Sequence, residues 1–288
     1  MPSRRPEARL APYARLPRTY RDLHIRHSTI DVYGRAHWLL TQHPVDSRRR
    51  DPYDAVVVTV EDGSAYATEL SAVLPGCRLL EALPDGGFVL AAGRSARDEE
   101  HVQVFDALGR STWTFRVGDG ISHFLADEAG DLWVGYFDEG IYGGDELSVP
   151  GLRRWSSTGE PLWAFRRLPE MDDGIDDCYA LNVSGRVAWA CHYPRFPLLE
   201  IHADQRVRVW RNPVRSPSAL AVHGDRVVFL NHLLVDCRLT DGTVEVVAEG
   251  PLRRADGGAL GRRRVVSRGP RLYVQEKPFT DWAVYDIG

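Results

Sequence analysis

Four polar side chains recur at one position of a repeated strand pattern, and their types suit acid–base chemistry or ligand binding. They stand three residues after an apolar or aromatic anchor in successive repeats, and they are Tyr136, His192, His232 and Glu276. Histidine and glutamate exchange protons, and both coordinate divalent cations. If the repeats are arranged around a common axis, these side chains converge on one small-molecule site, with a divalent cation as a possible cofactor.

Four further candidates lie in the neighbouring segments. Asp138 and Glu139 open the long glycine-rich stretch YFDEGIYGGDELSVPG, whose glycines indicate unusual backbone conformations. Arg195 lies beside the histidine column, and Asp177 ends an acidic stretch without calcium-loop spacing. The alternatives without function are a hydrogen-bonded strand-end histidine, a solvated glutamate and a solvated acidic turn.

The sequence carries no motif of a common catalytic or nucleotide-binding site. G-x-S-x-G, H-E-x-x-H, the Walker A loop and G-x-G-x-x-G are all absent. Cys191 and His192 are adjacent, but successive residues of a strand point to opposite faces, so they make a poor nucleophile–base pair. The catalytic residues, if the protein is an enzyme, therefore stay unassigned.

Composition narrows the classes of partner. The chain has 288 residues, of which 43% are hydrophobic, and a formal charge of -4. A dedicated nucleic-acid binder carries a basic excess, and a membrane-spanning helix needs about 18 successive apolar residues. Neither feature is present, so we expect no nucleic-acid partner and no membrane insertion.

The N-terminus and the cysteines predict a cytoplasmic protein. Prolines at positions 2, 6, 12 and 17 interrupt every apolar run that an export signal would need. The cysteines show no paired spacing, so we expect reduced, mostly buried thiols at all four: Cys77, Cys178, Cys191 and Cys237. Lys277 is the single lysine beside 35 arginines, which indicates the codon usage of a GC-rich bacterium.

The elements that position the candidates repeat six times. Each repeat has an apolar strand, a turn that contains glycine, an anchor-bearing strand, a variable loop and a hairpin. The anchors lie 40 to 56 residues apart, at Trp38, Val89, Trp133, Trp189, Phe229 and Tyr273. That period and the strand-like patterns predict an all-β fold, a six-bladed β-propeller of four-stranded antiparallel blades.

The last repeat stops after three strands, so its fourth strand must come from elsewhere. Residues 19–26 (TYRDLHIR) resemble the fourth strands of other repeats, which predicts a 3+1 closure of the ring by an N-terminal strand. We therefore expect a disordered tail over 1–18 and a single domain over 19–288. Its blades are predicted at about 27–75, 76–120, 121–174, 175–216, 217–258 and 259–288 plus 19–26.

Across about residues 19–288 the repeat resembles six-bladed β-propellers in general. The segment DLWVGYFDEGIYGG (131–144) is similar to one in bacterial propeller-like proteins of unassigned function. NHL-type and SMP-30/gluconolactonase-like propellers share the architecture that this resemblance implies. Their metal ligands have no residue-by-residue match here, so no ligand is carried over.

Two functions follow from where the repeats differ in length. Nearly all variation lies between the second and third strands, whose loops share one face with the blade connections. A small-molecule site at the central channel mouth would make the protein a binding protein or a metal-assisted hydrolase, lactonase or lyase. The alternative is a protein-interaction scaffold that uses the long loops of blades one to three. A polar pocket favours the first, and an exposed apolar patch favours the second.

Overall fold

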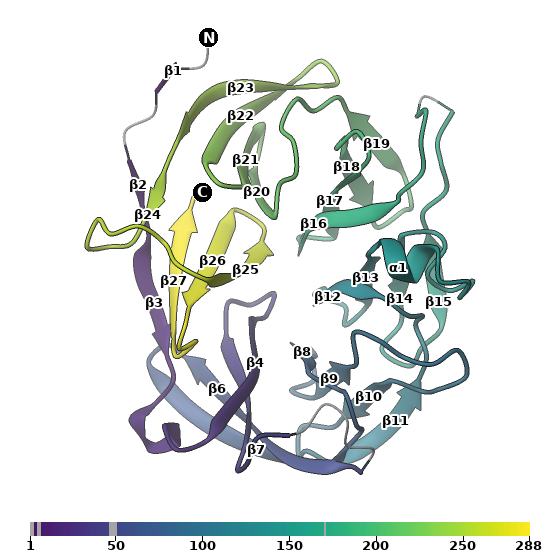
Figure 1. The fold of residues 1–288 in the computed structure, drawn as a ribbon, viewed down its shortest axis with the longest axis vertical. Coiled ribbons are helices and arrows are strands. Elements are labelled where there is room, and N and C mark those ends of the chain that lie inside the picture. Colours follow the sequence, from purple (N-terminus) through teal and green to yellow (C-terminus); the bar gives the residue numbers. More distant parts are fainter. Residues whose placement is uncertain (1–2, 5–6, 46–50, 170) are drawn as a thin grey trace. The chain divides into compact units, whose positions relative to one another are not determined.

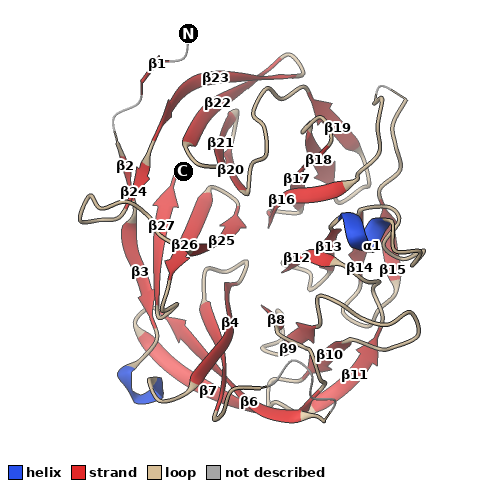
Figure 2. Ribbon diagram, in the orientation of Figure 1, coloured by secondary structure: helices blue, strands red, loops and turns tan. Residues whose placement is uncertain are grey.

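The chain folds into antiparallel β-sheets. The computed structural model describes residues 3–4, 7–45, 51–169 and 171–288. Within these residues there are six blades, each built on four antiparallel strands, so the fold is a six-bladed β-propeller (Figure 1). Helix in the described part is limited to η1 (Arg18–Tyr20) and α1 (Asp138–Ile141), as Figure 2 shows.

Two compact units each contain three blades. The continuous unit is Leu16–Asp177, and the split unit joins Met1–Arg15 to Cys178–Gly288. The blades of the continuous unit are β4 (His24–Ile30), β5 (Ala36–Thr41), β6 (Tyr53–Glu61) and β7 (Ser64–Val73); β8 (Leu79–Ala82), β9 (Phe88–Ala91), β10 (Val102–Phe105) and β11 (Ser111–Phe115); and β12 (Ile121–Ala126), β13 (Leu132–Tyr136), β14 (Leu152–Trp155) and β15 (Pro161–Ala164).

The split unit takes the remaining strands. Its blades are β16 (Asp177–Ser184), β17 (Val187–Tyr193), β18 (Leu198–His202) and β19 (Val207–Trp210); β20 (Ala219–His223), β21 (Arg226–Leu230), β22 (Leu234–Thr240) and β23 (Thr243–Gly250); and β25 (Arg263–Arg268), β26 (Arg271–Glu276), β27 (Asp281–Asp286) and β3 (Ala11–Arg15). Short parallel pairs join β1 (Ser3–Arg4) to β23 and β2 (Ala8–Arg9) to β24 (Leu252–Arg253).

Burial follows the position of a strand in its blade. All residues of β5, β9 and β13 are buried, because these second strands pack on both faces. The outermost strand β7 buries only Leu70 and Val73 among its residues. The near-continuous apolar runs of the second strands and the mostly exposed outer strand β7 are therefore both consequences of the layered packing of blades.

Asp-x-x-Gly turns close several hairpins. One carboxylate oxygen of Asp31, Asp106 or Asp127 accepts the backbone N–H groups two and four residues later, at 2.8 to 3.0 Å. The glycine three residues after each aspartate has a φ between 76° and 88°, a left-handed conformation that costs glycine least. These turns fix the register of the strands that they join.

The N-terminal segment differs from the prediction. The expected disordered tail over 1–18 is wrong where the structure describes it, because 8–9 and 11–15 form β2 and β3 and bury Leu10. The expected outer strand over 19–26 is also wrong, since η1 precedes β4, which pairs with β5.

The fourth strand beside β27 is β3, which lies upstream of the predicted range. Tyr13 packs edge-on against Tyr273 at 4.8 Å, and Arg15 forms an ion pair with Asp281. Pro12 is tolerated because an edge strand does not need every N–H. The similarity of 19–26 to other fourth strands reflects its content of β-forming residues, which β4 partly uses.

All four cysteines are free and buried, as predicted from their spacing. Among the described residues, no helix has the length and apolar character required to cross a membrane.

Candidate functional site

Tyr136, the last residue of β13, lies in the interior of the continuous unit. Its side chain is fully buried, and its hydroxyl donates a hydrogen bond to the Val117 carbonyl. Burial raises the pKa of the phenol above its ordinary value. The side chain thus packs and bonds within the fold, whereas the sequence predicted that it faces a ligand.

Asp138 and Glu139 are exposed in α1, on the long loop after β13. Glu139 forms an ion pair with Arg94, whose guanidinium also bonds Asp119 at 3.1 Å. Such exposed pairs contribute little to stability, about 1 kcal/mol or less. Tyr142 on the same loop is 68% exposed, which is the kind of apolar surface that the interaction hypothesis requires.

Asp177 is half-buried close to this loop. Desolvation by burial, with a smaller contribution from the negative charge of Asp138, raises the pKa of its carboxyl. Next to it, Asp176 accepts a hydrogen bond of 2.5 Å from the Tyr142 hydroxyl. Over the described ranges, no three or more His, Cys, Asp or Glu side chains are grouped so as to hold a metal ion.

His192 ends β17 in the split unit and is 1% exposed. Its Nδ1 donates to the Tyr193 carbonyl at 2.9 Å, and its own carbonyl accepts the Phe196 N–H at 2.9 Å. This is the hydrogen-bonded strand-end histidine of the alternative reading. The residue shapes the loop that carries Arg195.

Glu276 ends β26 and is half-buried. Its carboxylate accepts the Gly261 N–H at 2.5 Å. Arg263 lies directly opposite it on β25 and donates to the Asn231 carbonyl at 3.1 Å. Glu276 is thus linked through Arg263 to the turn that carries His232, and the structure brings these two candidates to neighbouring blades of one unit.

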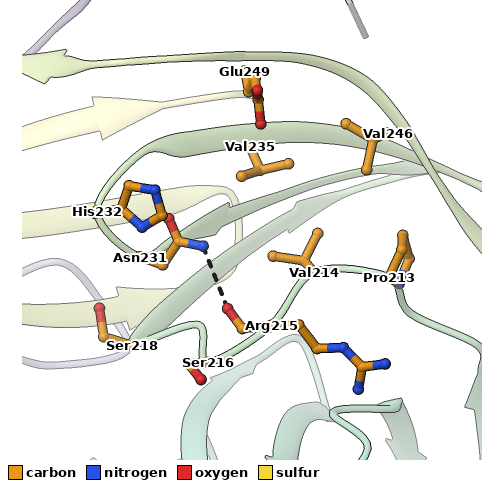
Figure 3. A pocket seen from close by; sticks show the side chains of 10 residues that line it. All are labelled: Pro213, Val214, Arg215, Ser216, Ser218, Asn231, His232, Val235, Val246 and Glu249. Carbon is orange, nitrogen blue, oxygen red and sulfur yellow. Dashed lines mark hydrogen bonds between the residues drawn. The ribbon is translucent and has the colours of Figure 1, made fainter. Parts of the chain in front are cut away.

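His232 is exposed and lines a pocket of about 740 Å³ in the split unit (Figure 3). It lies on the turn between β21 and β22. No hydrogen bond or ion pair joins its imidazole to any part of the chain that the structure describes. The imidazole is therefore available to a ligand.

Two segments form the rim of the pocket: residues 213–218, which connect two blades, and the turn at 231–232. The variable loops and the blade connections were predicted to share one face. Here the blade connection at 213–218 and the turn at 231–232 line the same pocket. Asn231 joins the two segments, since its side-chain Nδ2 donates to the Arg215 carbonyl at 3.3 Å (Figure 3). Ser218 bonds the Leu230 carbonyl through both its N–H, at 2.7 Å, and its hydroxyl, at 3.0 Å.

A buried asparagine holds the connection in place. Asn212 donates through Nδ2 to the carbonyls of Phe196, at 2.9 Å, and Val214, at 3.2 Å. Its Oδ1 accepts the Val214 N–H at 3.0 Å. The connection is therefore bonded to the loop at 193–197, and the pocket wall is fixed before any ligand binds.

The floor of the pocket is apolar. Val214 and Val235 are 6% and 5% exposed and belong to the core of the split unit. Val246 on β23 and Pro213 complete this surface. An apolar floor with a few polar groups at the rim is the usual composition of a small-molecule site.

Charged groups stand on two sides of this floor. Glu249 on β23 is exposed, and Figure 3 shows its carboxylate directed toward Val235. Arg215 lies on the other side, where its Nη1 donates to the Arg195 carbonyl at 2.8 Å and its guanidinium carbon is 6.0 Å from the ring of Phe196. Arg195 does not line the pocket itself. Its backbone carbonyl accepts the hydrogen bond from Arg215, which does.

Of the predicted site residues, the structure places His232 in the pocket and Arg195 beside it. Arg215, Ser216 and Glu249 were missed. The connection that holds Arg215 and Ser216 has a findable signal in the sequence, because it lies on the predicted variable face. Glu249 lies within an ordinary strand pattern and gave none.

Comparisons with known proteins support the fold. The YxzG family model matches residues 168–280, less than half of the chain. No curated protein shows significant similarity to the chain.

Solved propellers are similar in structure at low sequence identity. Hsv2 from Kluyvelomyces marxianus has a TM-score of 0.52 and 11% identity, over 92% of this chain and 76% of that one. The Cps50 (Swd1) β-propeller domain from Myceliophteria thermophila has a TM-score of 0.51 and 13% identity, over 92% and 84%. Virginiamycin B lyase from Staphylococcus aureus has a TM-score of 0.48 and 13% identity, over 96% and 99%. The first two support the propeller fold, and at this identity they carry no function.

Proposed function

We propose that the protein is a β-propeller that binds a small molecule in the pocket of the split unit. The observation that carries the proposal is the pocket of about 740 Å³, in which the available imidazole of His232 stands beside a floor of buried valines. Its volume lies within the range of known ligand sites, roughly 300–1,000 Å³.

The rigidity of the walls supports this proposal. Asn212 and Asn231 hold the connection and the turn through side-chain hydrogen bonds to backbone atoms. A preformed site loses little conformational entropy when a ligand binds, so a modest contact area suffices for measurable affinity. Ser216, in a left-handed conformation that costs about 1 kcal/mol or more, is held at the rim by these neighbours.

The test fills the pocket and compares it with a matched control. Val246→Phe places a larger side chain on the floor, whereas the neighbouring Val247 is exposed and does not line the pocket, so Val247→Phe is the control. Thermal-shift screening uses a panel of aliphatic carboxylates, amines, amino acids and dipeptides. We expect at least one compound to raise the melting temperature of the unmodified protein and the control but not of Val246→Phe. A panel without effect, or equal shifts in both variants, would overturn the proposal.

A further inference from the structure

We propose that the chain associates with a second copy of itself, through a basic surface on the split unit of one copy and an acidic surface on the continuous unit of the other. The basic surface comprises Tyr179, Tyr193, Arg195, Phe196 and Arg215. The acidic surface comprises Asp138, Tyr142, Glu146 and Val149. Neither surface depends on a ligand of the pocket.

Aromatic contacts hold the basic surface together. The ring of Phe196 lies 5.0 Å from that of Tyr179 and 5.8 Å from that of Tyr193. Arg215 donates through Nη1 to the Arg195 carbonyl at 2.8 Å, and Figure 3 shows its side chain directed away from the valines of the pocket floor. Both arginines are exposed, and Tyr193 is 46% exposed. Tyrosine and arginine are among the residues that contribute most at protein interfaces.

The loops that carry the basic surface do not balance its charge. Residues 193–197, 211–218 and 231–233 contain three arginines and a histidine but no aspartate or glutamate. Arg215 makes no ion pair with any residue that the structure describes. The planar guanidinium group of arginine matches the geometry of a carboxylate, so an acidic partner suits this surface.

The loop after β13 has the opposite composition. Residues 137–149 contain four acidic residues and no lysine or arginine. Two of these acids form ion pairs with arginines of neighbouring loops. The other two, Asp138 and Glu146, are exposed and make no ion pair within the described part of the chain. Burial and, secondly, the charge of Asp138 raise the pKa of the Asp177 carboxyl, which shows that negative charge is in excess here.

Exposed apolar side chains accompany the charges of the acidic surface. Tyr142 and Val149 are 68% and 54% exposed. The loop that carries them is fixed, since the Ser148 hydroxyl donates to the Asp119 carbonyl at 2.6 Å. An ordered loop loses little conformational entropy on association, and its apolar side chains gain by leaving water.

A second copy of the chain supplies what each surface lacks. The arginines of one copy can meet the carboxylates of the other, and an exposed tyrosine lies on each surface. Opposite charges across an interface attract and steer its formation. A foreign acidic or basic protein would satisfy only one of the two surfaces, whereas each copy of this chain carries both.

Sedimentation equilibrium from micromolar to millimolar concentration measures association of the full chain. The unmodified protein should associate. The double variant Arg195→Glu/Arg215→Glu should weaken association by about tenfold or more, because both surfaces are then acidic and repel each other. Asp138→Lys/Glu146→Lys should weaken it to a similar extent, because both surfaces are then basic.

An equimolar mixture of the two double variants gives the sharpest test. One contact between the two chains is then unmodified, and the other has the charges of both surfaces exchanged, so opposite charges meet in each. The mixture should therefore associate although each variant alone does not, which also shows that both variants are folded. Arg206→Glu/Glu160→Lys reverses exposed charges on hairpin turns outside both surfaces and, as the control, should behave like the unmodified protein.

Three results would overturn this inference. The first is an unmodified protein that stays monomeric at millimolar concentration. The second is association that both double variants retain, because it would use another surface. The third is a mixture that stays monomeric, because the two surfaces would then not meet. None of these results bears on ligand binding in the pocket, which the Val246→Phe comparison tests separately.

Discussion

Replacing Asn212 by alanine should weaken the split unit and its pocket together. The side chain is 8% exposed and bonds the carbonyls of Phe196 and Val214 and the N–H of Val214. In Asn212→Ala these three backbone groups lose the side chain that bonds them, while they stay buried. At about 1 kcal/mol for each hydrogen bond, the free energy of unfolding should fall by about 3 kcal/mol.

The Asn212→Asp variant tests the direction of these bonds. Aspartate keeps the shape and the Oδ1 acceptor, but at neutral pH its second oxygen faces the Phe196 and Val214 carbonyls, where the amide donated. Burial beside carbonyl oxygens raises the pKa of the carboxyl, because the charged form is disfavoured. The variant should therefore be at least as unstable as Asn212→Ala at pH 7 and should recover as the pH falls and the acid regains a donor.

Urea unfolding at pH 7 and pH 5, followed by far-UV circular dichroism, measures both effects. Binding of a compound identified in the pocket screen should also weaken in Asn212→Ala, because the wall at 213–218 loses its anchor. If Asn212→Ala lies within 0.5 kcal/mol of the unmodified protein (about the scatter of neutral surface changes), the assigned role of this side chain is wrong.

Three further predictions concern burial and turns. Burial lowers the pKa of His101, so the fold holds the neutral imidazole. The free energy of unfolding should therefore fall as the pH drops below the ordinary pKa of 6.5. His101→Gln should reduce this dependence of stability on pH, as measured by urea titrations at several pH values. Gly109→Ala should lower the free energy of unfolding by about 3 kcal/mol or more in thermal unfolding, because its φ is 76° and a Cβ would lie 1.9 Å from the Glu69 carbonyl oxygen. Gly63 has a similar φ of 79°, but a Cβ there would meet open space. Gly63→Ala should therefore lower the free energy of unfolding by only about 1 kcal/mol. Leu10→Ala should cost about 2–3 kcal/mol in the same assay, since this side chain is 4% exposed in the core of the split unit.

Clear results would contradict each of these. An unchanged pH slope in His101→Gln would mean that another group governs the acid limb. Equal stability of the two glycine variants would show that the turn at Gly109 relaxes away from Glu69. A neutral Leu10→Ala would mean that the N-terminal segment adds no stability to the split unit.

The fold was predictable because its signals are local and repeat. Turn glycines, aromatic anchors and apolar second strands recur six times, so a misread element is corrected by its counterparts. The N-terminal strand had no counterpart to correct it. Residues 11–15 contain Pro12 and three other exposed residues, so they lack the apolar pattern of a strand. Their pairing with β27 is supported instead by contacts with Tyr273 and Asp281, which are far away in the sequence.

The site was predictable only where chemistry and repeat position coincide. His232 follows a buried strand, and its exposed side chain lines the pocket. Tyr136 and His192 occupy the same column, but their side chains bond to the backbone carbonyls of Val117 and Tyr193. Whether a strand-end side chain meets a ligand or its own loop is decided by loop packing, which residue type does not encode. Glu249 lines a pocket only because the connection at 213–218 lies next to its strand, and the residue type does not indicate this.

The pairing of β3 with β27 has a consequence for the order in which the chain folds. Arg15 and Asp281 are 266 positions apart, while the continuous unit between them contains only local, sequential blades. During synthesis that unit has all its strands once Asp177 has emerged, whereas β3 has no partner until β27 has been made. Contacts so distant in sequence form slowly, and an unpaired edge strand is open to wrong partners in the interval. The strand β3, which is made before the continuous unit, is thus paired after that unit is complete.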